Sequence, residues 1–258
     1  MSATITYAEA EAKFPADVWK KFINHQNRWT VTVGGQEFPP GTDFTIKSPF
    51  GAVHSAVALK TDGTLDFDRP RYQETPFGQT IIWAKRKNGR IVIGFIVQPR
   101  PHADQPGEEN HDKPNEIVKF MTCIMGFKDK ARHGVVDAMK KVYESSSQAA
   151  RREGAEEMGT ANILSEWEHA TGHNPSPSFT STWGSATALQ IDLSTFTPAG
   201  VEPTEEVLGR HWLTVRQWKN ALALGYFKLK DGTKAYTAYD ASSAVVAMFL
   251  ASHPQYDR

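Results

Sequence analysis

Residues 144–159 read Glu-Ser-Ser-Ser-Gln-Ala-Ala-Arg-Arg-Glu-Gly-Ala-Glu-Glu-Met-Gly, and no other stretch of the chain constrains its chemistry as strongly. In a helix of about 3.6 residues per turn, Glu153, Glu156 and Glu157 stand at i, i+3 and i+4 and share one face. Like charges at this spacing repel one another. Hard divalent cations such as Mg²⁺ take oxygen ligands. The pattern therefore favours a metal site over a solvated acidic helix face.

The segment resembles the Nudix box, whose family pattern is Gly-x5-Glu-x7-Arg-Glu-U-x-Glu-Glu-x-Gly-U, where U is a bulky aliphatic residue. Every charged position and the final glycine match from Glu144 to Gly159. The two U positions are instead Gly154 and Thr160. A glycine inside a helix costs about 1 kcal/mol relative to alanine. Two core-facing anchors of the box helix are therefore missing.

The glycine that should open the box is not fixed by the sequence. The position six residues before Glu144 is Ala138. Upstream, Gly126-Phe127-Lys128-Asp129 resembles the Gly-Phe-x-Asp of the box entrance, which would imply an insertion within residues 130–143. Gly134-Val135-Val136-Asp137 is a competing candidate with a shorter insertion. Both remain open.

The order of elements predicts a mixed sheet covered on both faces. Helical spacing begins at Pro15, and a Lys87-Asn88-Gly89 turn joins two apolar runs. Extended segments are expected at 29–33, 53–59, 79–85, 90–97, 116–124 and 186–193, and helices at 145–158, 214–225 and 240–251. The resemblance implies the α/β (α+β) Nudix sandwich of helix, sheet and helix layers. Residues 1–75 would form an N-terminal accessory lobe, and residues 76–258 the Nudix hydrolase domain.

Composition and net charge limit the classes of partner that the chain is expected to bind. Lys plus Arg equals Asp plus Glu at 29 each, so a net charge of zero argues against nucleic acid and anionic membranes. The first 25 residues lack the apolar core of a signal peptide. The longest apolar run, 244–251, is too short to span a bilayer. Cys123 is the single cysteine, which suits a buried strand position and a reducing cytoplasm.

Further segments resemble the ADP-ribose pyrophosphatase branch of the family. They occur in the branch's order, although Pro99 replaces a tyrosine: Asn88 to Pro101, Pro175 to Phe179, and Glu202 to Thr214. The resemblance implies a nucleotide-derived small-molecule substrate, with ADP-ribose or a related nucleotide sugar as the best candidate. It also implies a homodimer formed through the N-terminal lobe.

The resemblance implies hydrolysis within a pyrophosphate, with Mg²⁺ or alternatively Mn²⁺ neutralising the phosphate oxygens and acidifying a water. The expected metal ligands are Glu153 and Glu157, with Glu156 as a further or bridging ligand. A backbone carbonyl of the entrance glycine, Gly126, would complete the shell. Arg152 would hold a carboxylate in place, and Glu144 is the candidate.

The general base is expected in the loop after the box, at Glu206 or Glu205; Glu144 and Glu156 are the alternatives within the box. Arg100 would contact phosphate or ribose, or else lie exposed at a strand end. Four aromatic residues could stack on a base, although core packing is the stronger expectation for each: Trp83, Phe95, Phe179 and Trp183.

Two other functions fit the same residues. One is a catalytically inactive Nudix-like module that binds a nucleotide or a protein. The other is a Nudix hydrolase acting on dinucleoside polyphosphates, NADH or damaged nucleoside triphosphates. The complete set of box carboxylates favours an enzyme over the inactive module.

Overall fold

The computed structural model describes residues 4–24, 31–33, 35–39, 41–48, 51–68, 71–74, 76–100, 118–128, 143–170, 172, 184–200, 207–237 and 241–256. The chain divides into two compact units, the first covering Met1–Thr75 and the second taking in Pro76–Pro175 and Trp183–Arg258. No helix in these described segments is both long and apolar enough to cross a membrane.

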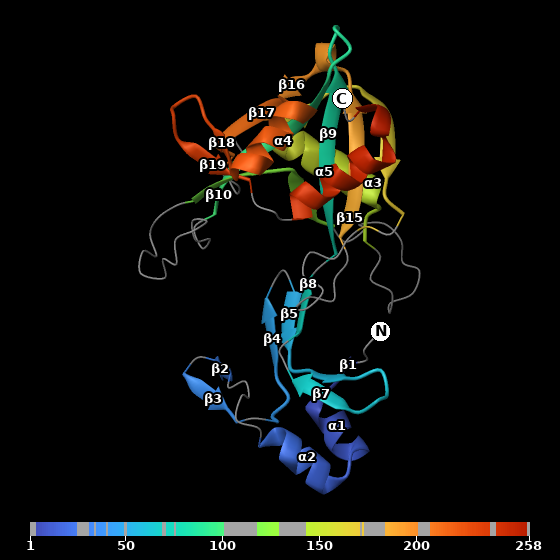
Figure 1. The fold of residues 1–258 in the computed structure, drawn as a ribbon, viewed down its shortest axis with the longest axis vertical. Helices are drawn as coiled ribbons and strands as arrows, with labels where there is room; N and C mark the ends of the chain where they lie inside the picture. The colour runs from blue at the N-terminus through green and yellow to red at the C-terminus, as the bar shows by residue number, and fades with distance from the viewer. Residues whose placement is uncertain are drawn as a thin grey trace. The chain divides into compact units, whose positions relative to one another are not determined.

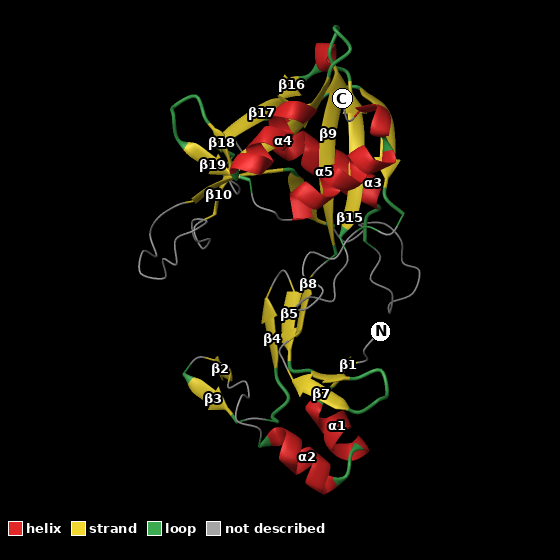
Figure 2. Cartoon of the chain, in the orientation of Figure 1, coloured by secondary structure: helices red, strands yellow, loops and turns green. Residues whose placement is uncertain are grey.

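The first unit consists of two short helices and small antiparallel sheets (Figure 2). Its elements are β1 Thr4–Ile5, α1 Tyr7–Lys13, α2 Ala16–Ile23, β2 Val31–Val33, β3 Gln36–Phe38, β4 Thr45–Ser48, β5 Gly51–His54, β6 Val57–Leu59, β7 Leu65–Asp68 and β8 Arg71–Glu74. Its small core gathers Tyr7, Ala10, Trp19 and Val57.

Helix α1 was not expected from the sequence, whereas α2 was. The Thr6 side chain accepts a hydrogen bond from the backbone N–H of Glu9, and the Glu9 carboxylate accepts one from the N–H of Thr6. This reciprocal pair is a capping box, which satisfies two of the donors that a helix start leaves open. The Thr-x-x-Glu spacing at 6–9 was therefore a readable signal for α1.

The second unit is built around a nine-stranded sheet with helices on its two faces (Figure 1). Its elements are β9 Phe77–Lys85, β10 Ile91–Arg100, β11 Val118–Thr122, β12 Ile124–Phe127, α3 Ser146–Glu153, η1 Gly154–Met158, β13 Gly159–Thr160, β14 Ile163–Glu168, β15 Ser185–Ile191, η2 Leu193–Thr195, β16 Thr197–Pro198, β17 Gly209–Thr214, α4 Val215–Leu224, β18 Tyr226–Lys228, β19 Lys234–Tyr236, α5 Ala241–Ser252 and η3 Pro254–Tyr256.

The sheet is mixed. Its strand order is β14-β15-β9-β10-β11-β19-β18, with β12 also paired to β9 and β17 also paired to β10. The pairs β15–β9 and β11–β19 are parallel, and the other pairs are antiparallel. The expected hairpin between β9 and β10 is confirmed, with Gly89 at φ 80° in its turn.

The β9–β10 hairpin opens into a fork. Residues Ile82–Lys85 of β9 pair with the first half of β10, whereas the second half of β10 pairs with β11. The chain then passes through the buried Cys123 into β12, which pairs with the first half of β9. Strands β11 and β12 thus occupy the two arms of the fork.

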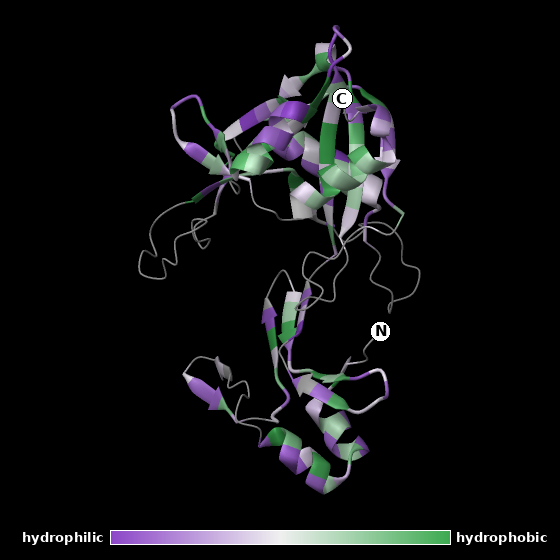
Figure 3. Ribbon diagram, viewed as in Figure 1, coloured by the Kyte–Doolittle hydropathy of each residue, from purple (hydrophilic) through white to green (hydrophobic). Residues whose placement is uncertain are grey.

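The two faces of the sheet carry separate cores. Ile81, Trp83, Ile93 and Phe95 pack with residues of α4 and α5, including Trp218 and Phe249. Ile82, Val92, Ile96 and Ile124 pack on the other face with Met158 of η1. Figure 3 shows that β9, between these cores, is hydrophobic along most of its length. The expected mixed sheet between helical layers is confirmed, with α3–η1 on the face opposite α4 and α5.

The packing of α5 can be tested through Phe249, which is fully buried with its ring centroid 5.5 Å from that of Trp83 and 5.7 Å from that of Trp167. Phe249→Ala should lower the free energy of unfolding by about 3–5 kcal/mol, because it leaves a cavity between these rings. Urea denaturation followed by tryptophan fluorescence measures the change. Leu224→Ala, at a residue that is 64% exposed, is the control and should change it by about 0.5 kcal/mol or less. Equal effects of the two variants would contradict this packing.

Candidate active site

Helix α3 begins with a capping box at Ser145. The Ser145 hydroxyl accepts a hydrogen bond from the N–H of Gln148, and the Gln148 side chain accepts one from the N–H of Ser145. Ala149 and Ala150 are buried against the sheet, where their small side chains allow the helix to lie close to the strands. The N-terminal half of the helix is thus fixed by its cap and by a short-range contact with the sheet.

The helix predicted over 145–158 is present, but only its first part is an α-helix. The α-helix ends at Glu153, and residues 154–158 form a single π-helical turn, η1. A π turn contains more residues than an α turn and frequently occurs at functional sites. The carboxylates on this segment differ in their exposure to solvent. The Glu157 residue is only 3% exposed, whereas the Glu156 side chain is 43% exposed.

Gly154 does not stand where an aliphatic anchor could fit. It is buried, and a β-carbon at this position would lie only 3.1 Å from the Cδ1 atom of Ile82. The helix backbone itself packs on β9 here. Glycine at this position therefore allows close packing, and the fully buried side chain at the end of η1 is that of Met158.

Glu153 lies directly against the backbone of Gly126 in β12. A β-carbon on Gly126 would coincide with the Glu153 carboxylate group. Only glycine leaves space for the carboxylate at this point of the strand. Of the two candidate entrance glycines, Gly126 is therefore placed beside a box glutamate, and Gly134 lies outside the described residues.

Arg152 connects three carboxylates. Its Nη2 donates to Glu144 Oε1 at 2.5 Å, and its Nη1 donates to Glu153 Oε1 at 2.5 Å and to Glu156 Oε2 at 3.2 Å. Burial disfavours the charged guanidinium. The hydrogen bond to Glu144 and the charge of Glu153 outweigh burial, however, and raise the pKa of Arg152 above its ordinary value. The structure thus pairs Arg152 with Glu144 and also with two of the expected metal ligands.

Lys128 adds a second cation beside this network. Its Nζ donates to the Ser146 hydroxyl at 2.9 Å, near the start of α3. Burial lowers the pKa of Lys128, and the carboxylates of Glu168 and Glu144 oppose that shift. The carboxylates around Arg152 are thus partly compensated by positive charge on two sides.

Glu157 is held at both its side chain and its backbone. Gln98, at the fork end of β10, donates from Nε2 to Glu157 Oε1 at 3.1 Å. Arg210 of β17 donates from Nε to the carbonyl oxygen of Glu157 at 2.5 Å and from Nη2 to that of Gly200 at 3.2 Å. No role was predicted for Gln98, although it lies in the segment from Asn88 to Pro101. Arg210 lies within the segment from Glu202 to Thr214, at a position to which the resemblance assigns no role.

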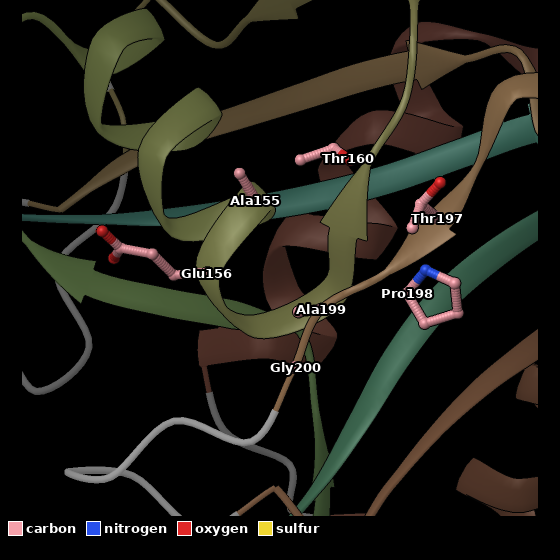
Figure 4. Close-up of a pocket in the computed structure, with 7 residues that line it drawn as sticks. All are labelled: Ala155, Glu156, Thr160, Thr197, Pro198, Ala199 and Gly200. Carbon is pink, nitrogen blue, oxygen red and sulfur yellow. The ribbon is translucent and has the colours of Figure 1, made fainter.

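A pocket of about 310 Å³ adjoins the π turn (Figure 4). Its lining residues are Ala155, Glu156, Thr160, Thr197, Pro198, Ala199 and Gly200. Gly159 directly follows the π turn. It has φ 139° and begins β13, where a β-carbon would collide with the carbonyl of Thr197. Its role is to let β13 and β16 form one wall of the pocket.

The donor atoms on α3–η1 suit a hard cation only in part. Among the described residues, no three His, Cys, Asp or Glu side chains are grouped closely enough to hold a metal ion. Mg²⁺, however, is usually held by one or two carboxylates together with waters and substrate phosphates rather than by an all-protein cage. Glu153, Glu157 and the Gly126 carbonyl supply oxygens of that type. A cation that binds Glu153 would take over the charge compensation that Arg152 now provides.

Several expected site residues are not placed beside this cluster. Glu205, Glu206, Phe179 and Trp183 lie outside the described residues, as does the side chain of Arg100, whose backbone pairs with Val118 at the end of β10. Two aromatic candidates for base stacking are core residues instead: Trp83 and Phe95, at 4% and 2% exposure.

Comparison with known proteins adds little to this geometry. No family model matches the chain, and no curated protein matches it. The solved structures that resemble it include a Nudix hydrolase from M. smegmatis, RenU, with 12% sequence identity and a TM-score of 0.39, covering 78% of this chain and 99% of that chain. Neither value is high enough to transfer a function, so the function must be inferred from the residues of this chain.

The contact between Glu153 and Gly126 can be tested by a double-mutant cycle. Gly126→Ala should lower the free energy of unfolding by about 1–3 kcal/mol, because its methyl group needs the space that the Glu153 carboxylate fills. In a Glu153→Ala background the same change should cost much less, since the competing group is gone. Urea denaturation of the four proteins measures the coupling.

Gly78→Ala is the matched control, because Gly78 pairs with Gly126 across β9 and β12 and has Ser185 and Ala149, not Glu153, as its neighbours. Its cost should be the same with and without Glu153. A Gly126→Ala cost that does not depend on Glu153 would refute the steric contact.

Proposed function

We propose that the protein is a divalent-metal-dependent hydrolase that cleaves the pyrophosphate of a nucleoside diphosphate derivative, with ADP-ribose or a related nucleotide sugar as its substrate. The observation that carries the proposal is the position of Glu153, whose carboxylate fills the side-chain space of Gly126 while Glu157, four residues on, is buried beside Gln98. Carboxylates kept this close to the sheet need a positive partner when a substrate phosphate approaches.

The residues of the site would have separate roles in binding the cation. Glu153, Glu157 and the Gly126 carbonyl would hold the cation, and Gln98 would fix the orientation of the Glu157 carboxylate. When bound, Mg²⁺ would neutralise phosphate charge and lower the pKa of the attacking water. Arg152 would remain paired with Glu144. Its positive charge would offset the repulsion among the carboxylates of the helix once Glu153 binds the cation.

The proposed reaction is an in-line displacement at one phosphorus of the pyrophosphate. The water oxygen forms a new bond to phosphorus, and the bond from that phosphorus to the bridging oxygen breaks. The water gives up its proton to a carboxylate base, and the bridging oxygen leaves as part of the second phosphate. The products are two phosphate monoesters.

The pocket beside Glu156 supports a substrate with a small polar moiety. Its volume of about 310 Å³ is at the lower end of ligand pockets, which run from about 300 to 1,000 Å³. Thr160 and Thr197 offer hydroxyl groups, and the chain at 198–200 offers backbone atoms. A pentose or a phosphate is of a size to enter, whereas a whole dinucleotide is not.

Turnover of ADP-ribose should require Mg²⁺ or Mn²⁺ and should rise toward alkaline pH, since the attacking water must lose a proton. Glu157→Gln should lower kcat by about 10²-fold or more, because a metal contributes several kcal/mol to the transition state and each ~1.4 kcal/mol is tenfold. Release of AMP from a panel of nucleotide substrates measures both effects.

Glu166→Gln is the control. Glu166 lies on β14 and pairs with the exposed Arg151 of α3. Its replacement by glutamine should not alter turnover. Hydrolysis that persists in excess chelator would refute the metal requirement. Metal binding without hydrolysis of any nucleotide would favour the inactive binding module instead.

The base can be tested at the acidic segment 202–206. The carboxylates on α3–η1 are engaged by Arg152, Gln98 and the proposed cation, so the proton acceptor should come from elsewhere in the chain. Glu206→Gln should lower kcat by about 10²–10⁴-fold, the usual contribution of a general base, with little change in Mn²⁺ affinity. Loss of turnover in Glu144→Gln or Glu156→Gln, with an unaffected Glu206→Gln, would move the base into the box.

A further inference from the structure

We infer that Arg210 is a positioning residue for the proposed metal site, which it serves by holding the backbone of Glu157 against the opposite wall of the neighbouring pocket. The inference rests on the proposed function. It goes beyond it in assigning a role to a residue that lies outside the acidic segment 144–159 and to which the resemblance assigns none.

The guanidinium of Arg210 bonds to both walls of the pocket. Its Nε donates to the carbonyl of Glu157 on the π turn, and its Nη2 donates to the carbonyl of Gly200, the last described residue after β16. Gly200 and Glu156 both line the pocket. One side chain therefore links the turn that carries the carboxylates to the segment that faces it.

Arginine is suited to this position for two reasons. The last carbonyls of a helix have no partner within the helix and carry partial negative charge, which a cation near the C-terminus stabilises. A planar guanidinium can also donate in two directions from one rigid group, which a lysine ammonium on a flexible stem does less well. Among the described residues, no carboxylate forms an ion pair with Arg210, so its bonds are to these two carbonyls.

Arg210 and Gln98 hold Glu157 from adjacent strands. Arg210 pairs with Ile96 in the β10–β17 register, two residues before Gln98. Gln98 binds the carboxylate and Arg210 binds the carbonyl of the same residue. The orientation of the Glu157 side chain thus depends on two strands of one rigid sheet. The β13–β16 pair and the bond from Ala199 N–H to the Met158 carbonyl at 3.2 Å keep the pocket walls together but do not reach Glu157.

The test uses the full-length protein and Mn²⁺ alone as the probe. Arg210→Met keeps the apolar stem and removes both donors. It should raise the dissociation constant for Mn²⁺, measured by electron paramagnetic resonance or calorimetry, by about 10-fold or more, the usual effect of losing a group that orients a metal ligand. Arg210→Lys, which keeps the charge and can reach one carbonyl, should give an intermediate value. Arg151→Met is the matched control at an exposed arginine and should bind Mn²⁺ like the wild type.

Thermal unfolding in the absence of metal separates positioning from simple stabilisation. A purely structural Arg210 would lower the unfolding midpoint and leave the Mn²⁺ affinity of the folded protein unchanged, which would overturn the inference. Arg210→Lys decides the question if Arg210→Met does not fold. If the wild type binds Mn²⁺ and both Arg210→Lys and Arg210→Met bind it with the same affinity, the positioning role of Arg210 is refuted and the proposed function is not. A wild type that neither binds Mn²⁺ nor hydrolyses a nucleotide would refute the proposed function, and this inference with it.

Discussion

The contact of the Glu153 carboxylate with the backbone of Gly126 is the constraint on which the site depends. It requires α3 to lie close to the sheet, and the small residues at the interface provide this closeness: Ala149, Ala150 and Gly154 on the helix side. It also requires a glycine in β12. Larger residues at any of these positions would lift the helix, and Glu153 would no longer reach the strand.

The fork in the β9–β10 hairpin explains how separate strands meet under one helix. Because β9 and β10 diverge, β12 brings Gly126 beneath Glu153 from one arm and the end of β10 brings Gln98 to Glu157 from the other. The π turn then determines which carboxylates face this opening. Glu157 is buried and bound to Gln98, whereas Glu156 is partly exposed and bound to Arg152 at the edge of the pocket. Backbone geometry, rather than the sequence spacing alone, therefore gives the carboxylates different surroundings.

The sequence predicted the sheet and helix layers because its hydrophobic pattern and its turn residues agree with one another. The β9–β10 hairpin could be predicted from Lys87-Asn88-Gly89, and the start of α3 from its serines. The π turn could not be predicted, since it depends on how closely Gly154 approaches Ile82 in three dimensions. The contacts of Arg210 could not be predicted for a similar reason. Arg210 binds two backbone carbonyls, and contacts with backbone atoms produce no pattern of residue types in the sequence. The capping box of α1, by contrast, was present in the sequence as Thr6 and Glu9 and was overlooked.

Arg152 sets the condition that a cation at the proposed site would have to meet. It bonds to Glu144, Glu153 and Glu156, so the acidic turn is compensated by a residue of the helix itself when no metal is bound. A metal that enters must compete with this arginine for Glu153. The most direct test is a crystal structure of the protein grown with Mn²⁺ and recorded at a wavelength where manganese scatters anomalously. An anomalous peak between Glu153, Glu157 and the Gly126 carbonyl, with Arg152 still bound to Glu144, is the predicted result. A crystal grown with Mn²⁺ that shows no peak at these atoms, and in which Arg152 is still bound to Glu153, would contradict it.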